Sequence, residues 1–494
     1  MSVAFPSRPQ EIFNQRRLLQ GFWFFVALCV AWGVLLGKPS TWAAPLGAGL
    51  IAVTALLPGY LWCSGRAIGF PLFPLFALTY LGAYGSPLLN GHERVAEYGA
   101  IEQLIASITV AGFLGLGTFV WWLFVHKAPP LPTVVRAFNP RQGEPFFWFG
   151  LLFDTLFMMS LQGQWLKVPT AVFSTLRATS NILGSTSAFG LTYLWGQKML
   201  SSQKRFILIF ILAISIMVRM SNLLLNNGMP ILFCALVGFL LGRKQVNWRF
   251  WVTLGCIMLL LGLLHVGKGE LRAKYWGEGV NLQPWDYPAR YSEWLDNSFQ
   301  KLGEGSDGQD TSTELTATGS LMQRGSLMHL LLFVQSKSPS ELPFLNGVTY
   351  LSLPSLLLPR VLNPDKVWSH EGNYILNVYY GLQSVTQVFQ TTVGWGLLNE
   401  AYANFGFIGC GLLALVVGGG YGFIARWSYG CPVFSARFMY MIMLTVGVLS
   451  TEWSASVYVS SLGQTTSLVV VLAYILMKPQ PLRHSSIAPQ GQVV

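Results

Sequence analysis

Charged side chains that could hold an anion gather near one set of predicted helix ends. They are five arginines, namely Arg177, Arg219, Arg272, Arg324 and Arg360. Arginine is always charged, and its planar fork of donors pairs with the oxygens of phosphate or carboxylate groups. The pattern predicts a site for a pyrophosphate or a carboxylated sugar. Arg219, Arg272, Arg324 and Arg360 are the predicted pyrophosphate ligands.

A purely structural interpretation of each arginine is also open. Arg177 could pair with Asp154, Arg324 and Arg360 could extend toward the membrane interface, and Arg219 could flank a membrane helix. For five arginines together this is less convincing, because arginine is normally enriched on the cytoplasmic side of a membrane.

Groups that could move a proton or contact a sugar lie in the same region. His370, in VWSHEGNYI, could act as a general base or contact a sugar. Glu400 lies near a helix end in GWGLLNEAYANFG, and an ionisable residue there is a functional candidate. Trp368 and Tyr402 could line a sugar channel or belong to an interfacial aromatic belt. No D-x-D, H-E-x-x-H, Walker A or G-x-G-x-x-G sequence occurs, so neither a metal nor a cofactor is expected.

The elements that must position these residues are membrane helices. Only 10% of the 494 residues are charged, against about 25% in soluble globular proteins. A chain of this size with so little surface charge is not a large soluble enzyme, a disordered protein or a disulfide scaffold. The composition predicts an all-α polytopic membrane protein.

Twelve stretches are apolar enough to be membrane spans. They lie near residues 20–36, 42–63, 68–84, 104–126, 146–163, 170–195, 205–220, 222–242, 249–266, 394–424, 435–452 and 462–477. With the N-terminus inside, most Lys and Arg residues of the short loops lie inside as well, which predicts cytoplasmic N- and C-termini. This distribution accounts for most of the net charge of +11 without nucleic acid as a partner.

The predicted organisation has three parts. Residues 1–266 form a block of nine helices, 267–393 a long extracytoplasmic loop, and 394–494 a block of three helices. Within the loop, 286–300 and 321–335 have the pattern of amphipathic helices, and 303–320 is polar enough to be mobile. The apolar, proline-broken segment 349–362 is expected to lie at the membrane surface.

Two tracts resemble bacterial O-antigen polymerases of the Wzy type. They are GVTYLSLPSLLLPRVLNPDKVW (347–368) and TTVGWGLLNEAYANFGFIGCGLL (391–413). In that family a tyrosine-bearing segment leads to a proline-arginine and a proline-lysine pair, and a later helix carries a glutamate followed by asparagine-phenylalanine-glycine. Arg219, at the end of an earlier helix, fits the pattern, although Met217-Val218 replaces the glycine-serine that often precedes it. The resemblance covers about residues 215–425.

The resemblance implies a metal-independent glycosyltransferase of the bacterial inner membrane with a fold related to the GT-C enzymes and to O-antigen ligases. Such an enzyme transfers a growing glycan from polyprenyl pyrophosphate to a lipid-linked repeat unit at the outer face. Glu400 or His370 would be the base, and Tyr350 and Asn404 would join the sugar contacts. Glu400 could instead pair with Arg219 or cap a helix end.

The expected partners are the lipid-linked oligosaccharide, membrane lipid, and a chain-length regulator and flippase of the same pathway. The alternatives are an O-antigen ligase and, in a different class, a flippase or transporter of lipid-linked oligosaccharides. The absence of a convincing internal repeat weakens the transporter alternative.

Overall fold

The computed structural model describes residues 15–167, 169–243, 248–276, 281–304, 326–358, 360, 363, 366–390 and 393–482. Helices dominate this part of the chain. The long helices are α2 (Gln15–Leu36), α3 (Ala43–Cys63), α7 (Ala100–Val125), α8 (Pro140–Gln162), α9 (Thr170–Gly196), α10 (Ser202–Met220), α11 (Met229–Gly242), α12 (Trp248–Trp276), α13 (Tyr287–Glu304), α19 (Gly396–Trp427), α20 (Ala436–Val448) and α21 (Ala455–Ile475). Helix α4 (Leu72–Tyr80) continues through a π-helical turn, Leu81–Gly85, into α5 (Ser86–Leu89). The other short helices are α6 (Glu93–Ala96), α15 (Leu327–Lys337), α16 (Leu353–Leu357), α17 (Glu371–Tyr379) and α18 (Val385–Gln390).

Nine helices in the described part of the chain are long and apolar enough to cross a membrane. They correspond to nine of the twelve predicted spans, which confirms a helical, multi-pass membrane protein. The other three predicted spans coincide with α9, α10 and α20, which do not meet the same standard of length and composition. Helix α10 carries three basic residues, and α20 has only 13 residues. These three spans stay predictions.

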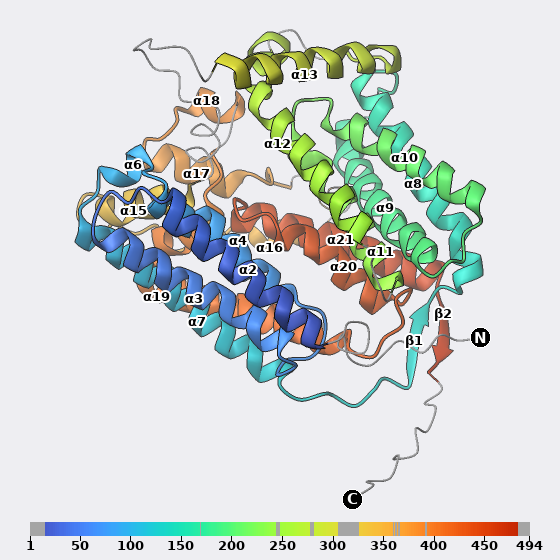
Figure 1. Ribbon diagram of the computed structural model, residues 1–494, viewed down its shortest axis with the longest axis horizontal. Coiled ribbons are helices and arrows are strands. Elements are labelled where there is room, and N and C mark those ends of the chain that lie inside the picture. The colour runs from blue at the N-terminus through green and yellow to red at the C-terminus, as the bar shows by residue number, and fades with distance from the viewer. Residues whose placement is uncertain are drawn as a thin grey trace, which may run out of the picture.

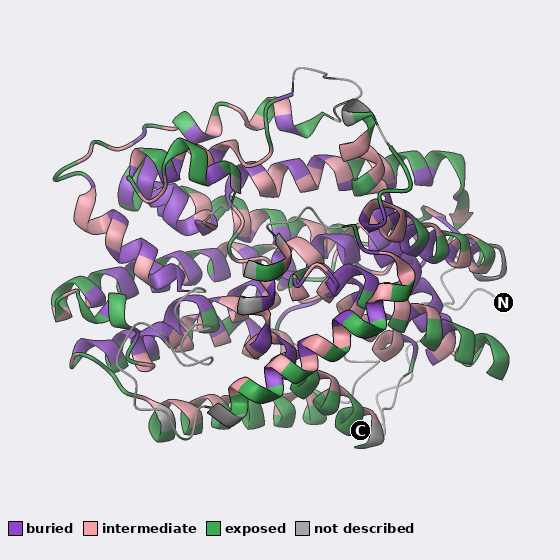
Figure 2. Cartoon of the chain, turned by 90° about the horizontal axis from the view of Figure 1, so that it is seen from above, coloured by how far each residue is buried: buried purple, intermediate pink, exposed green. Residues whose placement is uncertain are grey.

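Close approach of small residues holds the helices together. At Gly418 of α19, an added Cβ would lie 2.3 Å from the carbonyl oxygen of Gly117 in α7. At Gly238 of α11, it would lie 2.3 Å from the carbonyl oxygen of Phe189 in α9. Such contacts are typical of membrane helices, where packing rather than the hydrophobic effect brings helices together. Many large apolar side chains on the outer helices are exposed, which suits a surface facing lipid (Figure 2).

The two predicted helical blocks share one core. Helix α19 packs along α7, whereas α20 and α21 lie beside α9 and α11 (Figure 1). The three C-terminal helices therefore contact both halves of the first block rather than forming a separate unit.

The predicted amphipathic helix at 286–300 is confirmed as α13. Its buried residues Tyr287, Arg290, Trp294 and Ser298 recur every three or four positions, so they share one face. The Trp294 indole N–H donates to the Leu264 carbonyl oxygen of α12 at 2.7 Å, and α13 lies across the end of α12 (Figure 1). The second predicted helix is α15, which begins at Leu327. The predicted mobile stretch 303–320 lies outside the described residues from residue 305 onward.

The apolar segment near 349–362 packs partly on a long apolar helix, and its expected place at the membrane surface stays a prediction. Its helix α16 lies against α21, where the backbone of Leu357 closely approaches Gly463. A Cβ at position 463 would lie 2.4 Å from the Leu357 carbonyl oxygen. Because Gly463 has no side chain, the backbone of the segment can lie directly against α21. The residues of the segment alone do not indicate that a glycine of α21 is its packing partner.

A short antiparallel ribbon departs from the all-α prediction. Strand β1 (Val134–Ala137) pairs with β2 (Lys478–Pro481), with Val134 opposite Pro481 and Ala137 opposite Lys478. The ribbon lies at the opposite end of the helices from α6, α15 and α17 (Figure 1). This arrangement puts the 126–139 loop and the C-terminal segment on one face, as the charge distribution predicts.

Candidate functional site

A buried ion pair joins α8 to α10. Arg219 donates through Nε to Asp154 Oδ2 at 3.2 Å and through Nη2 to Asp154 Oδ1. Ser180 of α9 donates to the same carboxylate at 2.6 Å, and Arg219 Nη1 donates to Asn181 Oδ1 at 2.8 Å. Asp154 is fully buried and Arg219 is 4% exposed. The expected alternative pairing of Asp154 with Arg177 is therefore wrong, and Arg219 is already neutralised by an acid.

A glycine permits this pair. A Cβ at Gly184 of α9 would lie 2.3 Å from Asp154 Oδ2, so only glycine lets α9 approach the carboxylate this closely. Three helices thus meet around one charge pair. Because removal of either partner would leave an uncompensated buried charge, the pair fixes the relative positions of α8, α9 and α10.

Arg177, two turns into α9, has no such partner. Its side chain is exposed, and among the described residues it makes no hydrogen bond or ion pair. Its guanidinium interacts electrostatically with the guanidinium of Arg219 and with the imidazole of His370. Arg177 is therefore an unneutralised cation between the bundle α8–α10 and the 366–390 segment.

His370 brings a proton-accepting group to this cation. It directly precedes α17, and its Nδ1 is buried without a hydrogen-bond partner among the described residues. Its ring lies 5.1 Å from that of Trp368, which also stacks on Phe389 at 5.7 Å. Burial, and secondarily the Arg177 charge, lower the pKa of His370, so its imidazole is neutral at pH 7 and can accept a proton.

Glu400 lies deeper, between three helices. Its Oε2 accepts from the backbone N–H of Ala455 at 2.6 Å, at the N-terminus of α21. The other oxygen, Oε1, makes no well-aligned hydrogen bond in the described part of the chain. A Cβ at Gly372 in the first turn of α17 would lie 3.2 Å from Oε1 and 3.0 Å from Ser456 Oγ.

This position gives Glu400 a structural function. A carboxylate at a helix N-terminus stabilises that helix. Glu400 therefore caps a helix, as one of the alternatives expected from the sequence, but the helix that it caps is α21 and not its own helix α19. The alternative pairing with Arg219 is not found, since Arg219 pairs with Asp154. Glu400 is fully buried, so a substrate cannot reach it in this conformation.

The asparagine-phenylalanine-glycine tract makes a kink in α19. Phe405 and Gly406 leave helical geometry, and Gly406 has φ 60° and ψ −144°, a conformation essentially restricted to glycine. The kink frees the carbonyl oxygens of Ala403 and Asn404, which accept from the N–H groups of Leu345 and Asn346, each at 3.0 Å. The 345–349 turn is thereby attached to the middle of the helix.

Asn404 strengthens this attachment and is fully buried. Its Oδ1 accepts from Gly347 N at 3.0 Å, and its Nδ2 donates to Thr349 Oγ1 at 2.8 Å. Tyr402 is buried between the rings of Phe344 and Phe407. The two predicted sugar contacts Asn404 and Tyr402 thus have structural partners here.

The other two predicted sugar contacts are less enclosed. Tyr350 is half-buried beside Phe405, and burial together with the nearby Glu400 raises the pKa of its hydroxyl well above the usual range. Trp368, beside His370, is the more exposed of the two. Trp368 is therefore the predicted sugar contact that lies next to His370.

Of the remaining predicted arginines, the two that the structure describes are bonded to backbone carbonyl oxygens. Arg272 donates through Nε and Nη2 to the Leu223 carbonyl oxygen, at 3.2 and 2.7 Å, and so braces the turn after α10. Arg360 donates to the Lys366 carbonyl oxygen at 2.8 Å. Arg324 lies outside the described residues.

Two charged residues were missed by the sequence prediction. Lys366 is buried and donates to the carbonyl oxygens of Leu356 and Leu358, both at 2.7 Å; burial, then Arg360, lower its pKa. Arg290 of α13 is 5% exposed and lies 3.6 Å from the Tyr275 ring centroid. The proline-lysine pair and the helical spacing of α13 were the available signals for them.

Comparison with protein-family models, with curated proteins and with solved structures gave no match. The chemistry must therefore be argued from the site itself.

Proposed function

We propose that the chain is a membrane-embedded polymerase of lipid-linked glycans. It would transfer a growing glycan from polyprenyl pyrophosphate to the terminal sugar of a lipid-linked repeat unit, at the face that carries the 267–393 segment. The single observation that carries the proposal is that the unneutralised charge of Arg177 acts on the imidazole of His370, which is neutral at pH 7. Arg177 would supply a positive charge for the leaving pyrophosphate, and His370 would supply a base for the attacking hydroxyl.

The proposed reaction needs no further group. The acceptor hydroxyl oxygen attacks the anomeric carbon of the donor sugar, and the bond from that carbon to the phosphate oxygen breaks. The electron pair leaves on the lipid pyrophosphate, whose charge Arg177 stabilises. The hydroxyl proton moves to a ring nitrogen of His370. Trp368 supplies an aromatic face for the sugar.

Arg219 and Glu400 would then serve to position the reacting groups. Arg219 is held by Asp154 and repels Arg177, so an anion between α9 and α17 would relieve that repulsion. Glu400 holds the N-terminus of α21 and contacts the first turn of α17, which follows His370 directly. These contacts would fix the imidazole relative to Arg177.

The test is glycan profiling in cells that carry Arg177→Gln, with Lys167→Gln as the matched control. Lys167 is an exposed cation of the loop before α9, so its loss removes the same charge from the same region. Loss of one charge-assisted contact in the transition state costs about 2–4 kcal/mol, on the order of a hundredfold in rate. Arg177→Gln should therefore leave mostly single repeats, whereas Lys167→Gln should make wild-type chains.

Other outcomes would identify the alternatives. A ligase would leave long chains unattached on the carrier, and a flippase would leave single repeats on the inner leaflet. Wild-type chain lengths in Arg177→Gln, with normal protein level, would refute the catalytic proposal.

A further inference from the structure

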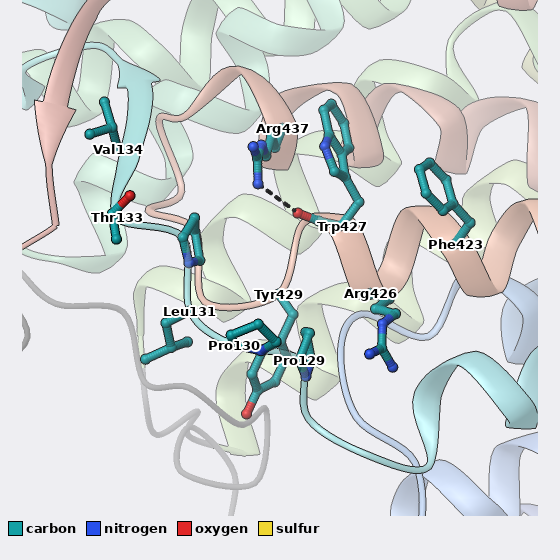
Figure 3. A pocket seen from close by; sticks show the side chains of 11 residues that line it. Pro129, Pro130, Leu131, Thr133, Val134, Phe423, Arg426, Trp427, Tyr429 and Arg437 are labelled. Carbon is teal, nitrogen blue, oxygen red and sulfur yellow. Dashed lines mark hydrogen bonds between the residues drawn. The ribbon is translucent and has the colours of Figure 1, made fainter.

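An open pocket hollows the opposite face of the molecule, next to the β1–β2 ribbon (Figure 3). Its volume is about 470 Å³. It lies between the loop after α7, the last turn of α19 and the start of α20. The lining residues are Pro129, Pro130, Leu131, Pro132, Thr133, Val134, Phe423, Arg426, Trp427, Tyr429 and Arg437.

The pocket is positively charged. Arg426 and Arg437 line it, and none of the eleven lining residues is acidic. Arg426 Nη1 donates to the Phe124 and Lys127 carbonyl oxygens, at 3.0 and 3.3 Å, and Arg437 Nη1 donates to the Trp427 carbonyl oxygen at 3.5 Å.

These contacts cap the C-terminal ends of α7 and α19, which is the structural explanation for both arginines. Each capping contact uses one guanidinium nitrogen, however, and a guanidinium offers five N–H donors. Neither arginine forms an ion pair with a described acidic residue. The pocket therefore keeps two positive charges and spare donors.

One wall of the pocket is apolar and exposed. Phe423 and Trp427 project to the same side from successive turns of α19 (Figure 3), and Leu131, on the loop after α7, is exposed as well. Trp427 and Tyr429 are residues typical of the boundary between headgroups and acyl chains. Phe423, one turn further into the membrane helix, continues this wall away from the loop.

We propose that this pocket binds the headgroup of an anionic phospholipid from the adjoining leaflet. The phosphate contacts the guanidinium group of Arg437, which lies on the same side of α19 as Trp427 and Phe423 (Figure 3), and the acyl chains lie along these two aromatic side chains. The charge distribution predicts that this face is cytoplasmic, where anionic lipids and basic residues meet. The exposed apolar wall favours a lipid over a soluble phosphate, which would leave that wall in water.

The test uses the full purified chain in lipid nanodiscs made with phosphatidylcholine and increasing phosphatidylglycerol, with retained lipid measured by native mass spectrometry. The informative variant is Thr133→Glu, and Thr133→Gln is its control of equal size. Thr133 is exposed in the pocket lining and takes no part in capping, so the glutamate adds repulsion without removing a contact. Thermal unfolding checks that both variants fold alike.

We expect wild type and Thr133→Gln to retain phosphatidylglycerol preferentially and Thr133→Glu to lose about tenfold in that preference. Arg437→Lys should keep more of the preference than Arg437→Gln, because lysine preserves the charge but not the fork. Equal retention of both lipids by wild type, or an unchanged preference in Thr133→Glu, would overturn the proposal. Displacement of the lipid by millimolar glycerol phosphate would also overturn it, because the site would then take a soluble phosphate.

Discussion

Replacing Asp154 with asparagine tests what the buried ion pair does. The amide keeps the shape of the carboxylate but removes its charge. Arg219, 4% exposed, would then be a buried cation without its counter-ion. The new amide also turns a donor toward a guanidinium that has only donors.

The expected cost follows from that geometry. Breaking a buried ion pair by removing one partner destabilises a protein by about 3–5 kcal/mol. Ser180→Ala is the control within the same cluster, because it removes one hydrogen bond to the carboxylate and leaves the charges matched. Its cost should be about 1.5–3 kcal/mol, that of a hydrogen bond to a charged group. The difference between the two variants isolates the unpaired charge.

The double variant Asp154→Asn, Arg219→Gln separates stability from catalysis. With both charges removed, the free energy of unfolding should recover most of the loss, because no uncompensated charge is left. The assay is unfolding of the purified protein together with glycan profiling in cells. Recovery of both stability and chain length would make Arg219 a structural residue, whereas recovery of stability alone would support its predicted contact with pyrophosphate. An Asp154→Asn single variant as stable as wild type would refute the argument.

Three further predictions use other features of the chain. Folding lowers the pKa of His370, so below pH 6.5 the unfolded chain binds a proton at this residue more readily than the folded chain does. Wild type should therefore lose stability relative to His370→Gln as the pH falls from 7 to 5, and equal stability profiles of the two proteins would contradict this. Gly406→Ala should lower the free energy of unfolding by about 1–3 kcal/mol and shorten the glycan, because alanine disfavours the kink and its Cβ would lie 2.9 Å from Phe344. The control Gly411→Ala, whose Cβ would point into open space on the same helix, should have little effect. In a cysteine-free background, an impermeant thiol reagent added to intact cells should label Ser292→Cys of α13 and spare Lys127→Cys after α7, and the reverse pattern would invert the topology.

The sequence predicted the helices well because apolar length is a local property. All twelve predicted spans coincide with helices, and the spacing of apolar residues in α13 identified its buried face. The packing of the α16 segment on α21 was not predicted, because its partner, Gly463, lies about a hundred residues later. Nothing local to the segment indicates that partner.

The candidate site was only partly predictable for the same reason. Arg177 and Arg219 are both plausible partners for Asp154, and the choice depends on how α8, α9 and α10 rotate about their axes. The sequence identified His370, Trp368 and Arg219, but it could not show that Arg177 has no hydrogen bond or ion pair among the described residues while its charge acts on the histidine. The type of a residue indicates which chemistry it can perform. Whether a charged residue is available for that chemistry depends on whether another residue already neutralises its charge.

The β1–β2 ribbon has a consequence for the order of biosynthesis. Val134 emerges from the ribosome 347 residues before its partner Pro481, so β1 must wait unpaired while every later helix is inserted. Closing so long a loop is entropically costly, and the ribbon can form only after α21 is in place. Until then the backbone N–H and C=O groups of β1 are an exposed edge that membrane proteases and chaperones could recognise. The ribbon would thus mark chains whose insertion is complete, and truncation before Lys478 should shorten the lifetime of the protein without removing any membrane helix.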